Sequence, residues 1–396
     1  MTQSDLHQRV LALAEKNHAR QIKWRRHLHQ YPETAFEELK TTQFLKTELK
    51  RLGLKFKPLK MKTGLLASIG NKQQGRAIAI RSDIDALPIT EQNKIPFKSK
   101  HPGRMHACGH DVHMATVLGA AHILTQLTDQ FSGEVRFLFQ PAEEHPPGGA
   151  RPMIANGALD KIDAILGLHV EPHLPVGLIS LRDGPTMAAV YDFDIHLLGK
   201  AGHAARPHTA IDAISLSAEV IDGLQKLVSR ETDPISPVAI TIGKVEGGIA
   251  RNVIADRVTL TGTARALEPK TAKLLPRLIK RTVAGICKAR GASFEIDSIA
   301  GYPVLKNNPR INKLIGRSYN ELFPGKKIAT TELVLGGEDF ACYLEKVPGA
   351  MFRLGVQNHS IGADKPWHAV NFMVDESSMK VGSATLAMAA LNFLNS

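Results

Sequence analysis

The chain has 396 residues, of which 43% are hydrophobic, 5% aromatic and 22% charged. This length and composition exclude a disordered chain and are typical of a globular protein with two or three domains. The sequence contains no internal repeat and no G-X-Y period, which excludes solenoid and collagen folds. Cys108, Cys287 and Cys342 are odd in number and widely spaced, which argues against a disulfide framework and favours a reducing compartment.

The formal net charge is +12, and residues 40–104 alone hold 15 basic and four acidic residues. A basic segment of this kind raises the question of nucleic-acid binding. Aromatic residues are few, however, and no nucleic-acid-binding motif is present. We therefore expect no nucleic-acid partner, because a basic surface that draws anionic substrates towards a site explains the charge equally well.

The N-terminus and the apolar runs bear on the compartment. The first 20 residues mix charges into their apolar positions and lack the features of a secretory signal. A membrane-spanning helix needs about 18 uninterrupted apolar residues, and the run VLGAAHILTQL is broken at His122 and Gln126. We expect a cytoplasmic protein with no membrane partner.

The first half of the chain alternates between helical and strand patterns. Apolar residues at helical spacing predict an N-terminal helix, and the capping-box pattern Thr34-x-x-Glu37 predicts a second helix from residue 34 to Gly53. Four apolar or alternating runs predict strands, and one run predicts a helix between the second and third of them. The strands are LLASIG, RAIAIRSDID, EVRFLFQP and DAILGLHV, and the helix is ATVLGAAHILTQL. This alternation predicts an α/β sheet with parallel strands and ligand sites at their carboxyl ends.

The pattern changes after Asp183. The next elements are predicted as strand, helix, two strands, helix and strand: VYDFDIHL, residues 210–229, PVAITIGKV, ADRVTLTGTAR, residues 269–290 and SFEIDS. This is the order of a ferredoxin-like α+β domain. We interpret residues 185–301 as a domain inserted between two parts of the first domain, residues 1–184 and 302–396.

The segment MHACGHDVH places Cys108 and His110 two residues apart, before a helix that we expect to begin near Asp111. Side chains two apart on an extended backbone point the same way. A thiolate and an imidazole are good ligands for a borderline-soft ion such as zinc. The alternative is a structural cysteine beside a capping histidine.

The run FLFQPAEE ends in two adjacent carboxylates, Glu143 and Glu144. Since adjacent strand residues face opposite ways, one carboxylate can coordinate a metal while the other stays uncoordinated and accepts a proton from the attacking water. The residues alone do not decide which is which, and a solvated acidic turn is the alternative. Two more histidines qualify as ligands, His169 at the end of an apolar strand and His368 after Trp367.

Together these segments resemble the metal-dependent amidohydrolases of the aminoacylase and carboxypeptidase G superfamily. Within it they are most similar to the branch of hippurate hydrolases, N-acyl amino acid amidohydrolases and plant auxin-conjugate hydrolases. Nine ordered blocks carry the resemblance over nearly the whole chain: RRHLHQYPETAFEE (25–38), RSDIDALPITE (81–91), MHACGHDVHMATVLGAA (105–121), FQPAEE with GGARPMIANGAL (139–159), GLHVEPHLPVG (167–177), GKAGHAARPHTAIDAI (199–214), NVIAD (252–256), GGEDF (336–340) and PGAMFRLG (348–355).

The resemblance implies a mixed-sheet, metallo-exopeptidase-like catalytic domain, with the inserted domain as lid and dimerisation domain. It also implies two divalent metal ions per subunit, zinc, manganese, cobalt or nickel, and Glu143 as the general base. The implied metal ligands are Cys108, His110, Glu144, His169 and His368.

The resemblance extends to substrate-binding residues in the second half of the chain. His203 is implied to polarise the scissile carbonyl, and Asn252, Gly336 and Gly337 are implied to bind substrate. In related enzymes this histidine comes from the partner subunit, so a homodimer is expected.

Two aspartates are expected to support the metal site. We expect Asp85 to orient a ligand histidine, and Asp111 either to support the same site or to cap the following helix.

The sequence departs from the family pattern beside the substrate pocket. His145, Pro146 and Pro147 follow the glutamate pair, Gly337 replaces a serine, and Trp367 and Val370 replace leucine and proline. These changes leave the substrate open more than the chemistry.

The resulting prediction is hydrolysis of the amide bond of a small N-acyl amino acid, which releases a carboxylic acid and an amino acid. Two alternatives remain. A thiol hydrolase would use Cys108 as nucleophile and His110 or His113 as base, and a non-catalytic binding protein would retain only the fold.

Overall fold

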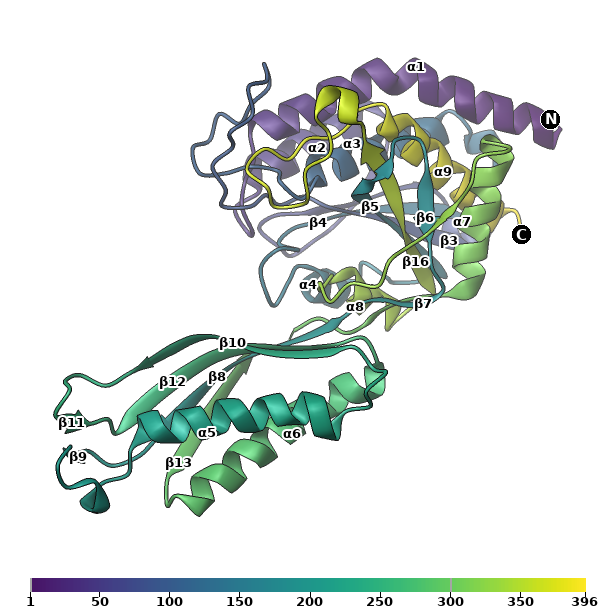
Figure 1. Ribbon diagram of the computed structural model, residues 1–396. Coiled ribbons are helices and arrows are strands. Elements are labelled where there is room, and N and C mark those ends of the chain that lie inside the picture. The colour runs from purple at the N-terminus through teal and green to yellow at the C-terminus, as the bar shows by residue number, and fades with distance from the viewer. Residues whose placement is uncertain (1, 300) are drawn as a thin grey trace. The chain divides into compact units, whose positions relative to one another are not determined.

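The computed structural model describes residues 2–299 and 301–396, and the chain divides into two compact units (Figure 1). Unit 1 comprises residues up to 184, 306–332 and 342–396, and unit 2 comprises 185–305 and 333–341. The segment 333–341, which the sequence-based domain division placed in the catalytic domain, therefore groups with the inserted one. None of the helices in the described residues is long and apolar enough to span a membrane.

A mixed sheet forms the centre of unit 1. In order across the sheet, its strands are β1 (Lys55–Lys57), β2 (Leu65–Gly70), β4 (Glu134–Gln140), β3 (Ala77–Asp83), β5 (Ala164–Pro175), β16 (Gly349–Gln357), β6 (Ile179–Leu181) and β15 (Ala329–Thr330). The central strands β4, β3, β5 and β16 run parallel. Strand β2 pairs antiparallel with β1 and β4, and β6 pairs antiparallel with β16 but parallel with β15. The fold class is α/β, as predicted, and the carboxyl ends of the parallel strands meet at one edge.

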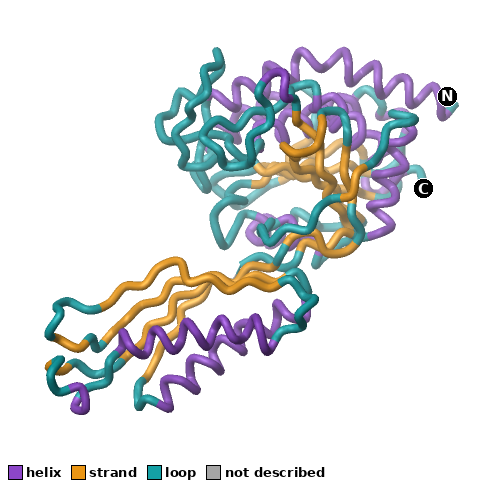
Figure 2. Tube along the Cα trace, viewed as in Figure 1, coloured by secondary structure: helices purple, strands orange, loops and turns teal. Residues whose placement is uncertain are grey.

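Helices pack against this sheet and against one another (Figure 2). They are α1 (Gln3–Gln30), α2 (Leu39–Arg51), α3 (His110–Thr125), α4 (Ala150–Ala155), α7 (Pro309–Leu322), α8 (Phe340–Leu344) and α9 (Ser378–Leu394), with 3-10 turns at Lys72–Gln74, Thr128–Gln130 and His359–Ile361. Helices α3 and α9 are buried on nearly all sides, which agrees with their apolar sequences. Their burial fixes the start of α3, where the site described below begins.

Unit 2 has the ferredoxin-like arrangement predicted for the inserted domain. Strands β8 (Ala189–Leu198), β10 (Val238–Gly247), β12 (Arg257–Ala266) and β13 (Ser293–Ile299) form an antiparallel sheet in the order β10-β12-β8-β13. Helices α5 (Ala213–Lys226) and α6 (Pro269–Ala289) pack on it through a common apolar core. The remaining elements of this unit are β9 (Gly202–His203), β11 (Val253–Ile254), the 3-10 turn Pro207–Thr209 and the π turn Leu227–Glu231. Strands β7 (Gly184–Met187) and β14 (Leu305–Asn307) and helix α8 each include residues of both units.

One helix start differs from the prediction. Helix α2 begins at Leu39, with Glu38 as its N-cap residue, and not at residue 34. Thr34 and Glu37 instead form a turn in which the amide of Glu37 donates to the carbonyl of Thr34 over 2.9 Å. The amides of Lys40 and Thr41 at the start of α2 are bound by the carboxylate of Glu33, at 3.2 and 2.8 Å. The residues of the predicted capping box therefore form a turn before the helix, and the carboxylate of Glu33 caps the helix instead.

Candidate metal centre

Cys108 and His110 lie on either side of a glycine at the start of α3. Gly109 is the N-cap residue of the helix and has φ = 88°, in the left-handed region. A Cβ at this position would meet Cγ2 of Val170 at 2.5 Å, so only glycine fits. The backbone between the two side chains is therefore not extended, as the spacing argument assumed. The left-handed glycine still brings both side chains into one group with His169, in which the potential ligand atoms lie within 4.8 Å of one another.

Two histidines of this group are held by backbone carbonyls. His110 donates from Nδ1 to the carbonyl of Asp85 at 2.8 Å, and His169 donates from Nδ1 to the carbonyl of Val170 at 2.8 Å. These bonds orient both rings and leave Nε2, and not Nδ1, as the atom that can bind a cation. His169 lies inside β5, which continues to Pro175, and not at the end of the strand as predicted. It is nevertheless near the end of β3, because Gly167 pairs with Arg81.

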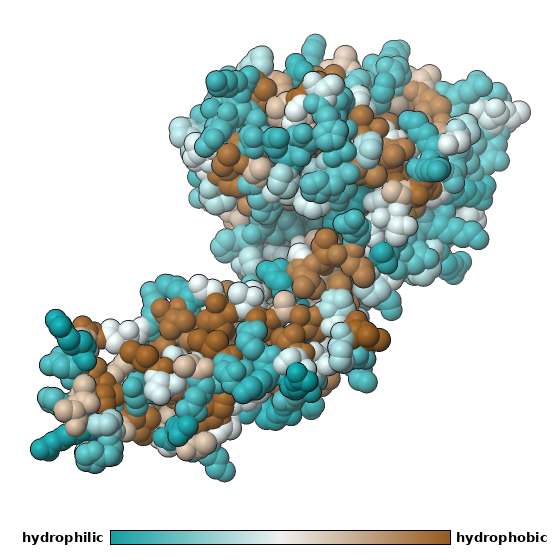
Figure 3. Space-filling model, in the orientation of Figure 1, coloured by the Kyte–Doolittle hydropathy of each residue, from teal (hydrophilic) through white to brown (hydrophobic). Residues whose placement is uncertain are grey.

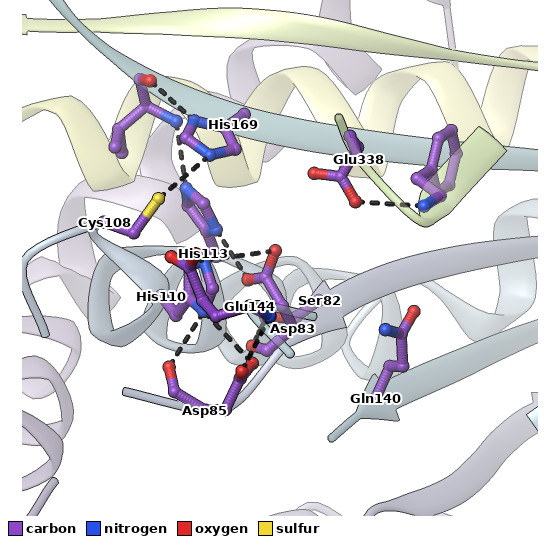
Figure 4. Close-up of polar contacts among 12 residues, drawn as sticks. Ser82, Asp83, Asp85, Cys108, His110, His113, Gln140, Glu144, His169 and Glu338 are labelled. Atoms are coloured by element: carbon purple, nitrogen blue, oxygen red, sulfur yellow. Dashed lines mark hydrogen bonds and ion pairs between the residues drawn. The ribbon is translucent and has the colours of Figure 1, made fainter. Parts of the chain in front are cut away.

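The free donor atoms converge (Figure 4). Nε2 of His169 lies 3.5 Å from Sγ of Cys108. Oε1 of Glu144 lies 3.8 Å from Nε2 of His110 and 3.4 Å from Nε2 of His368. In the described part of the chain, Nε2 of His110 and Oε1 of Glu144 are buried without a hydrogen-bond partner. A cation would satisfy both atoms, and thiolate, imidazole and carboxylate are its usual ligands.

His368 is held next to Cys108 through its backbone. Its amide donates to the carbonyl of Ala107 at 2.9 Å, and its φ is 64°. The preceding Trp367 donates from Nε1 to the carbonyl of Val170 at 3.1 Å. The C-terminal loop is thereby fixed to the strand that carries His169, which explains how a residue so distant in sequence reaches this group.

Glu143 and Glu144 lie in a bend, because β4 ends at Gln140. The alternation of strand residues therefore does not separate them, contrary to the sequence argument. The bend begins at Ala142, whose φ is 55°. Glu143 also groups with His110 and Glu144 at ligand distance, so the geometry allows either carboxylate to coordinate.

The surroundings of the group are strongly acidic. Burial, followed by Glu144, Glu143 and Asp83, raises the pKa of the Cys108 thiol well above its usual value. Burial alone would lower the pKa of His110, but Asp83, Asp85 and Glu144 raise it to about 10. An excess of buried negative charge of this kind favours a bound cation.

The same geometry argues against a thiol hydrolase. A catalytic cysteine needs a depressed pKa, whereas that of Cys108 is raised. His113 cannot serve as its base, because Nδ1 bonds to Oδ1 of Asp83 at 2.7 Å and Nε2 accepts from the amide of Val170 at 2.9 Å. Both ring nitrogens of His113 are thus committed to the protein.

Comparison with known proteins identifies the family. The model of peptidase family M20/M25/M40 matches residues 79–392. The chain belongs to this family. It is 40% identical over 372 residues to an N-acetyl-L-cysteine deacetylase of Bacillus subtilis, covering 94% of this chain and 88% of the relative. It is also 45% identical over 285 residues to an N-acyl-L-amino acid amidohydrolase of Geobacillus stearothermophilus, covering 72% and 77%.

A solved structure supports the same family assignment. A Bacillus subtilis protein described as a dinuclear metal binding peptidase of the M20 family superposes with a TM-score of 0.83 at 35% identity, covering 96% of this chain and 99% of that one. The 396-residue chain described here is therefore a metal-binding hydrolase that acts on amides, as its sequence predicted.

The substrate-binding residues expected from the resemblance lie in unit 2 of this M20 hydrolase. His203 pairs with Val253 between the short strands β9 and β11, and Asn252 is the residue just before that pair. The amide of Ala204 donates to the carbonyl of Asn252 at 3.1 Å, so His203 and Asn252 occupy one small, exposed substructure. The amide of Ala188 donates to the carbonyl of Gly336 at 2.9 Å. A Cβ on Gly337 would meet Val190 at 2.5 Å, so the glycine allows close packing there.

The two aspartates that were expected to support the metal site, Asp85 and Asp111, make different contacts. Asp85 lies beside His110, with Oδ1 at 3.4 Å from Nδ1, and its Oδ2 accepts from the amide of Glu144 at 3.0 Å. Asp111 does not cap α3. Its Oδ2 bonds to Nε of Arg25 and Nδ1 of His29, both at 2.8 Å, and so fixes the start of α3 to helix α1. The helix begins at His110, one residue earlier than expected, which places Asp111 inside its first turn.

Sequence reasoning missed several buried residues around this M20 site. Asp83 bonds to Arg81 at 2.7 Å as well as to His113. Although burial would raise it, the pKa of Asp83 is held well below its usual value by His110, His113 and Arg81. The position of His113, three residues after His110 on one helix, was a signal that it faces the same region. Nothing in the local sequence indicated its bond to Val170.

Proposed function

We propose that the protein hydrolyses the amide bond of N-acyl amino acids with two divalent cations. The ligands in this proposal are Cys108, His110, Glu144, His169 and His368. The observation that carries it is the pair of buried atoms that have no hydrogen bond among the described residues, Nε2 of His110 and Oε1 of Glu144, with thiol and imidazole groups beside them. Such a mixed donor set accepts zinc, manganese, cobalt or nickel.

In this proposal Glu143 is the general base. When bound, the cations supply Lewis acidity, which polarises the scissile carbonyl and makes hydroxide available near neutral pH. Glu143 takes a proton from the attacking water and then delivers it to the leaving amine. His110 and His169 each donate a hydrogen bond from Nδ1 to a backbone carbonyl. These bonds orient the rings so that Nε2 is the atom that would bind a cation.

Residues of unit 2 are assigned to substrate binding from the family resemblance. We assign polarisation of the carbonyl oxygen to His203, and contacts to the substrate to Asn252, Gly336 and Gly337. The pairing of His203 with Val253 supports a common role for His203 and Asn252, because it holds both in one substructure. A preorganised donor at the developing oxyanion contributes roughly 3 kcal/mol to catalysis.

The proposed substrate class rests on two of the relatives. They are described as acting on N-acetyl-L-cysteine and on N-acyl-L-amino acids. We propose the same class of small, anionic substrate here, which also suits the net charge of +12.

We further propose a cytoplasmic homodimer that associates through unit 2, the lid and dimerisation domain of this proposal. Unit 2 exposes large apolar side chains, and Figure 3 shows hydrophobic residues over this unit. Among them Val245, near the end of β10, is 53% exposed, and Ile249, in the loop that follows β10, is 89% exposed. Apolar side chains left in water favour association with another surface.

The decisive experiment compares wild type and Glu143→Gln. Metal-free wild type is screened against N-acetyl, N-benzoyl and indole-acyl amino acids, with zinc, manganese and cobalt added in turn. We expect metal-dependent release of the amino acid, and loss of turnover in Glu143→Gln with unchanged metal content. Activity that survives complete metal removal, or a Glu143→Gln variant as active as wild type, would overturn the proposal.

A further inference from the structure

The turn that presents Glu143 and Glu144 starts from an unfavourable backbone conformation. Ala142 is fully buried and has φ = 55°, in the left-handed region where a Cβ crowds the following carbonyl. A non-glycine residue keeps this conformation only when its surroundings hold it there. The direction of both glutamates therefore depends on whatever holds Ala142.

Glu38 makes the contact that holds it. The amide of Ala142 donates to Oε1 of Glu38 at 2.9 Å, between residues 104 positions apart. Glu38 is the N-cap residue of α2, yet its side chain makes no capping bond to its own helix. Glu33 binds the first amides of α2 instead. The fully buried carboxyl of Glu38 is thus directed to the turn and away from its own helix.

A second carboxyl holds the other end of the same turn. The amide of Glu144 donates to Oδ2 of Asp85 at 3.0 Å. The amides on both sides of Glu143 are therefore bound by buried carboxyl groups, one from α2 and one from the segment after β3. Two fixed amides leave the intervening residue little freedom to rotate.

The bond from the amide of Ala142 requires an acceptor oxygen on residue 38. Burial and the neighbouring Asp85 raise the pKa of Glu38 to about 7. A glutamine offers the same acceptor oxygen at the same reach, so it can replace Glu38 in this contact.

We propose that Glu38 is a positioning residue of the metal centre, which holds Ala142 in its left-handed conformation and thereby aims Glu143 and Glu144. This inference rests on the proposed function, because it assigns the two glutamates to base and ligand. It adds a residue from the first helix–turn segment, to which no role in the reaction has been assigned.

The test compares Glu38→Ala with Glu38→Gln and with Glu48→Ala as the matched control. Glu48 is a buried carboxylate on the same helix that accepts from Nε1 of Trp24 at 2.9 Å and makes no contact with the turn. The measurements are kcat and KM for an N-acyl amino acid, zinc affinity by chelator competition, and unfolding by denaturant. Displacement of catalytic groups by about 1 Å can lower rates about 100-fold.

We expect kcat of Glu38→Ala to fall about 10- to 100-fold, with KM changed less than about threefold. Zinc affinity should fall about tenfold. Glu38→Gln should stay within about threefold of wild type, since it retains the acceptor. Glu48→Ala should lose stability but keep kcat and zinc affinity.

Two results would overturn the inference. One is a Glu38→Ala variant that loses no more kcat and zinc affinity than Glu48→Ala. The other is a Glu38→Gln variant that falls as far as Glu38→Ala. If Glu38→Ala does not fold, Glu38→Asp takes its place, because its shorter side chain keeps the charge but does not reach Ala142, and a wild-type rate there would equally contradict the inference.

Failure of the proposed function gives a different result. Wild type would then hydrolyse no N-acyl amino acid with any metal. In that case the zinc affinities of the Glu38 variants alone test the role of Glu38, because zinc affinity depends on the orientation of Glu144 and can be measured without turnover.

Discussion

Nε2 of His110 lies 3.8 Å from Oε1 of Glu144, and neither atom has a hydrogen-bond partner among residues 2–299 and 301–396. Buried polar atoms almost always have a hydrogen-bond partner, and Nε2 of His368 lies 3.4 Å from the same glutamate oxygen, so these atoms are placed to bind one cation together. The backbone bond at Nδ1 of His110 rules out a simple rotation of the ring. We interpret these two atoms as two ligands of one cation, which the folded chain holds in position before the cation binds.

The same pair predicts how Glu144 acts on stability and on metal binding. Glu144 raises the pKa of His110, which means that the carboxylate stabilises the protonated ring of the metal-free centre. Glu144→Gln should therefore make the metal-free protein less stable by about 1 kcal/mol and weaken metal binding at least about tenfold. Denaturant unfolding and metal titration of both proteins measure the two effects. A metal-free Glu144→Gln variant as stable as wild type would contradict this explanation.

His113 should act on stability through two bonds at once. Its ring connects Asp83 to the amide of Val170, and all three groups are buried. His113→Leu would leave an amide and a carboxylate oxygen without this partner, at about 1–3 kcal/mol each. We expect the free energy of unfolding to fall by roughly 2–5 kcal/mol. His122→Leu, on the partly exposed side of the same helix, is the control and should change it far less.

Ala142 offers a test of the strained turn that does not involve a charged group. Glycine adopts the left-handed region freely, so Ala142→Gly should relieve roughly 1–2 kcal/mol of strain. The more flexible unfolded chain offsets about 0.4–1 kcal/mol of this gain, and the loss of the buried methyl group offsets about 0.8 kcal/mol. We therefore expect the free energy of unfolding to change little. Ala79→Gly, in the interior of β3, loses an equally buried methyl group with no strain to relieve, so it should destabilise the protein by more than about 1 kcal/mol. An Ala142→Gly variant destabilised as much as Ala79→Gly would show that the turn is not strained.

Many of the helices and strands could be predicted, because local patterns of apolar residues indicate them. The runs LLASIG and EVRFLFQ became β2 and β4, and the order of elements after residue 185 indicated the ferredoxin-like unit. The cysteine, histidine and glutamate residues that we propose as metal ligands could be selected from the sequence mainly because the family resemblance implies them. Burial of a strand or a helix depends mainly on its own sequence, so such features are visible locally.

The remaining details depend on contacts that sequence spacing does not record. Ala142 adopts a left-handed conformation because Glu38, far away in the sequence, binds its amide. The alternation argument for the glutamate pair failed for this reason. The start of α2 was misplaced because Glu33, and not Thr34, caps the helix. In each case a buried carboxylate bonds to a distant backbone amide, and no local pattern predicts its partner.

The pH dependence of stability should reveal the buried cluster at His29. Its two ring nitrogens face carboxylates, with Nδ1 at 2.8 Å from Asp111 and Nε2 at 3.1 Å from Glu91. Burial and Arg25 lower the pKa of His29, but bonds to Asp111 and Glu91 outweigh them and raise it above 6.5. Because the folded pKa is raised, the charged ring stabilises the fold fully below about pH 6.5, and this contribution is lost as the pH rises through the folded pKa.

We therefore expect His29→Gln to destabilise the metal-free protein more at pH 6 than at pH 9, as measured by denaturant unfolding. His122→Gln is the control with the opposite sign. Burial, Arg20 and Lys16 lower the pKa of His122, so the neutral ring is favoured in the folded state. Wild type then loses stability below about pH 6.5 as the unfolded chain takes up the proton, and glutamine removes that loss. Equal destabilisation by His29→Gln at both pH values would mean that the ring is neutral in the fold, and that its two carboxylate contacts do not bind a cation.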